Sequence, residues 1–401
     1  MNQSLPDMWN QQFINDPYPA YRQLLAIEGA IHTEGVWMLC HHADVQAALR
    51  HPGLGTTQLD VDAALVAQYG LEPIVNARRH MMLFTNPPDH TRLRGLVSRA
   101  FTPRAVDRMR TAIEHLVLQL LDELDDGHID LISRFAYPLP VTVIATMLGI
   151  PHDDLELFRR WSQPIAAFIA GSTETEADVW LRASDAAREM AGYFIVEARR
   201  RRAAPGDDLL TALAQAEDGG DRLSADELVA NAILLLVAGH ETTTNLIGNG
   251  MLSLLRHPQQ LALLQQDPTL LGNAVEELLR YDSPVQYTER IALQDTTIGT
   301  AMIAEGETVQ LFIGAANRDP QRYPDPDILD VQRADVRHLA FAHGAHFCLG
   351  APLARLEARI AIGALLERAP RLALTDEPLV WRPNFALRGL VRLPLVIGRG
   401  G

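Results

Sequence analysis

Residues 338–362 read HLAFAHGAHFCLGAPLARLEARIAI and join a glycine-rich turn to a long apolar-periodic segment. Cys348 lies in the turn, and the segment that begins near Pro352 has the pattern of a helix. A sulfur at a helix N-terminus faces free N–H groups and the positive end of the helix dipole, and both stabilise a thiolate. Gly344 and Gly350 allow tight turns and a close backbone approach to a planar ligand. The stretch therefore predicts a functional thiolate at position 348.

Three other roles for Cys348 are open on these residues alone. It could be an inert core cysteine, a catalytic nucleophile assisted by a nearby histidine, or a zinc ligand together with His343 and His346. Zinc is disfavoured because no second Cys/His pair follows at zinc spacing. The order Phe, Gly, His, Cys, Gly ahead of a long helix is a more specific signal than a bare cysteine would be.

Residues 224–257 predict one long buried helix. Ser224 and Glu227 form a capping-box pattern, and apolar residues follow on most sides as far as about His257. At about 1.5 Å per residue this helix would be roughly 50 Å long. Its centre, AGHET at 238–242, breaks helix preferences with a glycine, a carboxylate and a hydroxyl in a buried run. Such rule-breaking indicates a functional site, and the alternative is a core helix with a solvated polar edge.

In these two stretches the chain resembles the cytochrome P-450 superfamily. Residues 341–350 match the family's haem-binding loop, F-x-x-G-x-H-x-C-x-G, and residues 238–242 match its oxygen-activating A-G-x-[DE]-T. The resemblance runs from about Asp16 to the final strands and is nearest the soluble bacterial branch of macrolide hydroxylases and biotin-pathway enzymes. It implies a mainly α fold with a minor β region, in which a long central helix lies over a buried haem.

Position 342 departs from the family pattern, because Ala342 stands where the family usually has glycine or serine. If this position needs a positive φ, alanine adds strain of about 1 kcal/mol. We do not expect that strain to prevent haem binding.

The resemblance assigns roles to further residues. It makes Cys348 the axial iron ligand of haem b, and a thiolate ligand favours O–O cleavage. It assigns Glu241 to relay protons from solvent and Thr242 to hold the proton delivered during that cleavage. Haem carries two propionates, so buried cations and donors are expected beside them. The cofactor-binding residues expected from the family's motifs are His90, Arg94, Arg290, His346, Cys348, Leu83, Ala238, Gly239, Phe341, Gly350 and Ala354.

Glu277 and Arg280 match the family's E-x-x-R, and positions i and i+3 share one face of a helix. A surface ion pair is the ordinary explanation of such a tetrad. The resemblance instead adds Arg333 as the third member of a Glu-Arg-Arg network that stabilises the fold near the cysteine loop.

The composition predicts a single large domain over residues 1–401. Of these residues 47% are hydrophobic and 21% are charged, which is an ordinary globular balance with ample material for a core. No repeat, low-complexity tract or linker interrupts the chain. We expect a helix-rich part at 89–280 and mixed α/β parts at 1–88 and 281–401, with an irregular lid or binding loop at 51–85.

Charge and cysteine content limit the partners and the compartment. A net charge of −15 disfavours binding to nucleic acid, whose phosphates need cations. Two cysteines, Cys40 and Cys348, are too few for a disulfide framework and fit a reducing cytoplasm. The N-terminal residues have neither a signal-peptide pattern nor a membrane-length apolar run, so we expect a cytoplasmic protein without membrane contact.

The resemblance implies a monooxygenase that uses O2 and two electrons. The chain contains no flavin or ferredoxin segment, so a separate donor is expected, namely a ferredoxin with its reductase. A basic patch for that donor is expected from Arg99, Arg104, Arg108, Arg355 and Arg359, although scattered solvated arginines are the alternative.

The expected substrate is an apolar small molecule. Its pocket should be lined by residues 53–85 and 161–180, by Leu234 and Val237, and by Val285, Gln286 and residues 385–387. A peroxide-driven peroxygenase and a non-catalytic haem sensor are the alternatives. A peroxygenase would not need the Glu241–Thr242 pair, which argues against the first.

Overall fold

The computed structural model describes residues 10–33, 35–57, 61–170, 176–218 and 220–398, together with positions 6, 8 and 59. Helices dominate and strands are short, so the prediction of a mainly α fold with a minor β region is confirmed. The chain divides into two compact units. The mixed unit comprises Met1–Gly55, Glu114–Tyr137 and Thr242–Gly401, and the helical unit comprises Thr56–Ile113 and Pro138–Glu241. The expectation of one domain over 1–401 stays a prediction.

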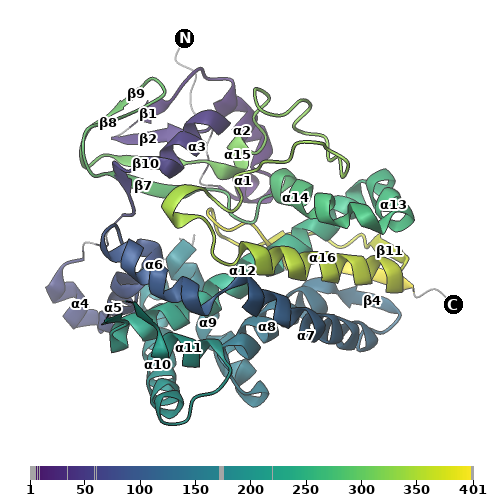
Figure 1. The fold of residues 1–401 in the computed structure, drawn as a ribbon. Coiled ribbons are helices and arrows are strands. Elements are labelled where there is room, and N and C mark those ends of the chain that lie inside the picture. Colours follow the sequence, from purple (N-terminus) through teal and green to yellow (C-terminus); the bar gives the residue numbers. More distant parts are fainter. Residues whose placement is uncertain are drawn as a thin grey trace. The chain divides into compact units, whose positions relative to one another are not determined.

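The main sheet of the mixed unit has five strands in the order β1-β2-β10-β7-β3. Buried and partly exposed residues alternate along β10, as its sequence predicts, and Val309 and Leu311 point into the core. These two residues share one buried cluster with Val45 and Leu49 of α3, which lies beside the sheet (Figure 1). The bounds are β1 Ile31–Thr33, β2 Val36–Leu39, α3 His42–Arg50, β3 Leu54–Gly55, β7 Thr288–Ala292 and β10 Thr308–Leu311.

Two helices of the mixed unit, α13 (Pro258–Gln266) and α14 (Leu271–Tyr281), pack against α16 (Ala351–Arg368), the helix that follows the cysteine loop (Figure 1). A Cβ at Gly250 of α12 would lie 3.1 Å from Leu278 of α14 and 3.7 Å from Ile362 of α16. This glycine therefore lets α12 approach α14 and α16 closely. The other elements of the unit are α1 Gln11–Asn15, α2 Tyr18–Leu25, β4 Gly127–Asp130, η2 Ile132–Ala136, η4 Pro268–Leu270, β8 Thr296–Ile298, β9 Ala301–Ile303, α15 Ile313–Ala316, η5 Gly344–His346, β11 Arg371–Leu374, β12 Val380–Trp381, β13 Leu390–Arg392 and β14 Pro394–Gly398.

The helical unit is built around the pair α9 and α10. Their contact is aromatic: the Phe158 ring of α9 lies 4.9 Å from the Tyr193 ring and 5.6 Å from the Phe194 ring of α10. The elements of this unit are α4 Ala63–Tyr69, α5 Glu72–His80, η1 Met82–Phe84, α6 Asp89–Ala100, α8 Pro138–Leu148, η3 His152–Asp154, α9 Leu155–Ala170, α10 Glu176–Ala203, α11 Leu209–Gln215, β5 Glu217–Asp218 and β6 Asp221–Arg222. Two helices, α7 (Pro103–Asp122) and α12 (Ala225–Arg256), continue from this unit into the mixed unit.

The long helix predicted from the capping box is confirmed as α12. The Glu227 N–H donates to Ser224 Oγ (3.1 Å), and the Ser224 N–H donates to Glu227 Oε2 (2.8 Å). The predicted irregular stretch at 51–85 is wrong in part, because α4 and α5 are helical. Asp62 caps α4 by accepting from the Ala64 N–H, and Gly70 ends it in the left-handed conformation.

Some predicted pocket-lining positions lie outside the described residues, namely 58, 60 and 171–175. Among the residues that the structure does describe, no helix is both long enough and apolar enough to cross a membrane.

Candidate active site: the cysteine loop and the central helix

Backbone hydrogen bonds fix the loop that precedes α16. The Cys348 N–H donates to the Phe341 carbonyl (2.9 Å), and the Ala342 N–H donates to the Leu339 carbonyl (2.8 Å). Cys348 lies two residues ahead of Gly350, which is the N-cap of α16. The backbone that carries the sulfur is therefore fixed at the positive end of an 18-residue helix, as the sequence predicts.

Two residues of this loop have left-handed backbone. Gly344 has a φ of 72°, and a Cβ there would lie 2.5 Å from the Leu49 carbonyl oxygen, so only glycine fits. Ala342 has a φ of 55°, which confirms positive φ at the position where the sequence departs from the family pattern. An L side chain in this conformation costs about 1 kcal/mol relative to glycine. The loop therefore carries a small backbone strain.

The two cysteines lie in different environments, and both are free. Cys40 is buried, and burial, with a smaller contribution from the Asp319 charge, raises the pKa of its thiol far above the usual range. Cys348 is partly exposed. His343, a candidate zinc ligand beside it, lies with Nδ1 3.3 Å from the Arg50 guanidinium. Cys40 thus has the buried environment of an inert core thiol, whereas the Cys348 thiol is partly accessible.

The Glu-Arg-Arg network expected near the loop is present in the mixed unit. Arg280 donates to both carboxylate oxygens of Glu277 (2.7 and 2.8 Å), and Arg333 donates to Glu277 Oε1 (3.2 Å). Glu277 and Arg280 are completely buried. The other N–H groups of Arg280 bond to the carbonyls of Asn317, Pro326 and Ile328. The network therefore ties α14 to the segment that leads into the cysteine loop.

Arg290 on β7 is a buried cation with no carboxylate partner among the described residues. Its guanidinium donates to Thr288 Oγ1 (3.2 Å) and to the Glu289 carbonyl (2.7 Å), and only 7% of the residue is exposed. Burial lowers the pKa of Arg290 to about 10, because a buried charge without a counter-ion is costly. A guanidinium in this state fits an anionic ligand.

The centre of α12 has one open face. From Leu228 to Leu254 every residue is buried except Ala238, Gly239 and Thr242. Positions i, i+1 and i+4 lie on one side of a helix, so two small residues and one hydroxyl line this face. Such a face suits a planar ligand that lies close to the backbone.

Gly239 has a second reason to be glycine. A Cβ at this position would lie 3.1 Å from Ile144 Cγ1 of α8, within the helical unit. The glycine costs the helix up to about 1 kcal/mol relative to alanine, and from the sequence that cost indicated function alone. The structure adds close helix packing as a cause.

Glu241 is the last residue of the helical unit and is buried beside His240. His240 Nε2 lies 3.9 Å from Glu241 Oε2 and 3.4 Å from Ser162 Oγ, and its Nδ1 lies 2.8 Å from the Leu236 carbonyl. Nδ1 carries a proton when it donates to that carbonyl, and the Ser162 hydroxyl beside Nε2 also donates to the Arg159 carbonyl (3.2 Å). The sequence alone does not reveal this contact, because nothing in the local pattern relates Ser162 to residue 240.

The remaining predicted cofactor residues divide between the units. In the helical unit, His90 is buried in the first turn of α6, Arg94 follows at i+4 on the same face, and Leu83 lies exposed in η1. The mixed unit holds Thr242, Arg290, Phe341, His346, Cys348, Gly350 and Ala354.

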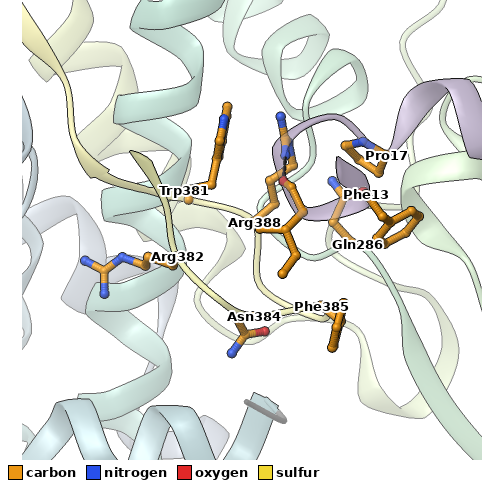
Figure 2. A pocket seen from close by; sticks show the side chains of 10 residues that line it. Phe13, Pro17, Gln286, Trp381, Arg382, Asn384, Phe385 and Arg388 are labelled. Carbon is orange, nitrogen blue, oxygen red and sulfur yellow. Dashed lines mark hydrogen bonds between the residues drawn. The ribbon is translucent and has the colours of Figure 1, made fainter. Parts of the chain in front are cut away.

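A small pocket opens within the mixed unit beside α1 and the loop after β12 (Figure 2). It contains about 240 Å³ of empty space, including open solvent. Gln286, expected in the substrate pocket, lines it, but its amide is already bonded at both ends, to the Tyr21 hydroxyl (2.8 Å) and the Ser283 carbonyl (2.7 Å). Gln286 is therefore a structural link. The lining residues are Phe13, Ile14, Pro17, Gln286, Trp381, Arg382, Asn384, Phe385, Arg388 and Gly389.

Comparison with known proteins identifies relatives over almost the whole chain. The Cytochrome P450 family matches residues 63–370. Cytochrome P450 monooxygenase PikC of Streptomyces venezuelae is 44% identical, over 97% of this chain and 93% of that protein. 6-Deoxyerythronolide B hydroxylase of Saccharopolyspora erythraea is 40% identical over 98% of each protein. The crystal structure of P450BioI in complex with a hexadec-9Z-enoic acid-ligated acyl carrier protein matches with a TM-score of 0.90, at 37% identity over 96% of this chain and 99% of that one.

These relatives bear out the resemblance seen in the two motifs, including its bacterial branch. Enzymes of this kind carry haem b and receive electrons from redox partners. Within the mixed unit, the glycine-containing cysteine loop and the buried cation of Arg290 are compatible with such a planar, dianionic cofactor. The chain therefore belongs to the cytochrome P450 family and is a haem-dependent monooxygenase.

Proposed function

We propose that Cys348 is the thiolate ligand of the haem iron in this monooxygenase. The observation that carries the proposal is the loop itself, in which backbone hydrogen bonds and the N-terminus of α16 hold a partly exposed sulfur. When bound, the haem supplies the oxygen chemistry of the reaction. The protein's part is to hold the cofactor, exclude water and deliver protons.

The anchors that we propose for the propionates are Arg290, His346, His90 and Arg94. Arg290 is the best supported, because its buried charge has no carboxylate partner among the described residues. Contacts with the macrocycle are proposed for Leu83, Ala238, Gly239, Phe341, Gly350 and Ala354.

Glu241 and Thr242 are the proposed catalytic residues. Thr242 belongs to the open face of α12, and its hydroxyl could hold a proton there. Glu241 is buried one residue earlier, and its carboxylate can take up a proton and pass it inward.

We also propose an apolar small-molecule substrate, a ferredoxin with its reductase as the electron donor, and a cytoplasmic location. The hydroxylase and the acyl-carrier-protein complex among the relatives support a macrocyclic or fatty acyl substrate class. Substrate-induced shifts of the Soret band across a panel of such compounds would test the class, and no shift with any of them would contradict it.

The test of the ligand is the Soret band of the dithionite-reduced protein under carbon monoxide. We expect the position diagnostic of thiolate ligation in the wild type and its loss in Cys348→Ser. Cys40→Ser is the matched control, because Cys40 is buried in the same unit and should leave the band intact. A thiolate band that persists in Cys348→Ser would contradict the proposal.

A further inference from the structure

A cluster of charged and aromatic side chains in the mixed unit surrounds Phe341. Arg355 of α16 donates from Nε and Nη2 to the two carboxylate oxygens of Glu276 on α14, at 2.6 and 2.8 Å. His338 Nε2 lies 3.2 Å from Glu276 Oε2. We call Glu276, His338 and Arg355 the Phe341 clamp. It joins α14, α16 and the start of the cysteine loop, which lie together in Figure 1.

The clamp holds the Phe341 ring from two directions. The Arg355 guanidinium lies 4.5 Å from the ring centroid, within cation–π distance. The His338 ring lies 5.7 Å away at a tilted angle. Phe341 in turn accepts the Cys348 N–H at its carbonyl (2.9 Å), so one residue separates the clamp from the cysteine backbone.

The clamp has no net charge. His338 Nδ1 accepts from the Ala340 N–H (3.1 Å), so the ring proton lies on Nε2 and the neutral histidine donates to Glu276. One cation and one anion then remain, paired through two parallel hydrogen bonds. Burial acts to raise the pKa of Glu276, but the hydrogen bonds from His338 and Arg355 outweigh it and lower the pKa to about 2.

We infer that the Phe341 clamp positions the cysteine loop, so that Arg355 is a positioning residue and not a docking cation for the electron donor. The inference rests on the proposed ligand role of Cys348. It corrects the expected basic patch at one position, because Arg355 is already paired. Arg359, one turn further along α16, is exposed and has no ion pair among the described residues. It keeps the docking role proposed for it.

The test follows how fast the ferrous carbon-monoxide complex of the holoenzyme loses its thiolate Soret band. Arg355→Leu keeps an apolar side chain but removes the guanidinium that donates both hydrogen bonds to Glu276. Glu276→Gln removes the negative charge that accepts them. We expect both variants to lose the band about five- to thirtyfold faster than the wild type. Arg355→Lys keeps the positive charge but cannot make two parallel hydrogen bonds, so it should restore only part of the lifetime of the thiolate band. Arg368→Leu is the control, since it breaks a 3.0 Å ion pair with Asp122 at the far end of the same helix.

The two main variants separate positioning from charge. A through-space effect of charge would change the band lifetime of Arg355→Leu and Glu276→Gln in opposite directions. Loss of positioning would shorten the lifetime in both variants. Lifetimes equal to that of Arg368→Leu, together with a raised KM for ferredoxin in Arg355→Leu, would overturn the inference. If Arg355→Leu does not fold, Glu276→Gln decides the outcome alone. Absence of the thiolate band from the wild type would instead refute the proposed ligand.

Discussion

The cysteine loop and the centre of α12 hold polar groups in different ways. In the network that ties α14 to the segment before the loop, Glu277 and Arg280 are completely buried, and each has several partners. In α12 the Thr244 hydroxyl and both ends of the Asn245 amide are buried without a hydrogen-bond partner among the described residues. The first region is fixed by paired charges and hydrogen bonds, and the second by packing.

Packing at Asn245 shows how the second region is held. A Cβ at Gly389 would lie 1.9 Å from Asn245 Oδ1, so the amide lies directly against the backbone after β12. Asn249, one turn on, donates to the Arg388 carbonyl (3.0 Å), but its Oδ1 has no partner in the described chain. The contrast suits the proposed role of the loop, because a metal ligand needs one fixed geometry.

The largest change in unfolding free energy should come from removing one member of the buried Glu-Arg-Arg network. Arg280→Leu leaves the Glu277 carboxylate buried beside Arg333 alone, and removing one partner of a buried pair costs about 3–5 kcal/mol. We expect the holoenzyme to lose that much unfolding free energy in urea. Arg22→Leu is the control, because its pair with Asp327 is exposed and should cost about 1 kcal/mol or less. Equal losses in the two variants would show that the network carries no special stability.

A smaller change, an increase in unfolding free energy, should come from removing a buried hydroxyl in α12. Thr244→Val replaces a buried hydroxyl that has no partner among the described residues with a methyl group of similar size. We expect it to stabilise the protein by about 1–2 kcal/mol, since an unsatisfied buried donor is penalised. Thr242→Val, two residues earlier on the open face, should leave stability nearly unchanged but lower the yield of product per electron pair. Destabilisation by Thr244→Val would show that its hydroxyl does have a partner.

Local pattern was enough to predict much of this molecule. The bounds of α12 follow from a capping box and a continuous apolar run, and both hydrogen bonds of the box are present. The position of Cys348 ahead of α16 follows from Pro352 and the glycines before it. These features are predictable because each depends on residues a few positions apart.

The features that were missed depend on residues far apart in the chain. Glu276 and Arg355 are 79 positions apart, and neither lies in a local pattern that names the other. The two ends of Gln286 meet Tyr21 and Ser283, and the first of these pairs spans 265 positions. Only the folded chain shows that Arg355 is already paired with Glu276 and that Gln286 is a structural link between Tyr21 and Ser283. The helices α4 and α5 were missed for another reason, because short helices carry few periodic apolar residues.

The smallest expected effect tests the strain in the loop. Ala342 has a φ of 55°, so Ala342→Gly should relieve about 1 kcal/mol of backbone strain. Its side chain also packs against the core cluster of the main sheet, and losing that methyl offsets part of the gain. We expect a net stabilisation of about 0.5 kcal/mol in the urea unfolding of the holoenzyme. Ala345→Gly is the matched control, because Ala345 lies in η5 without positive φ and should lose about 0.5–1 kcal/mol. If both substitutions lower the unfolding free energy by the same amount, the left-handed backbone at position 342 is held without strain, and alanine fits there as well as glycine would.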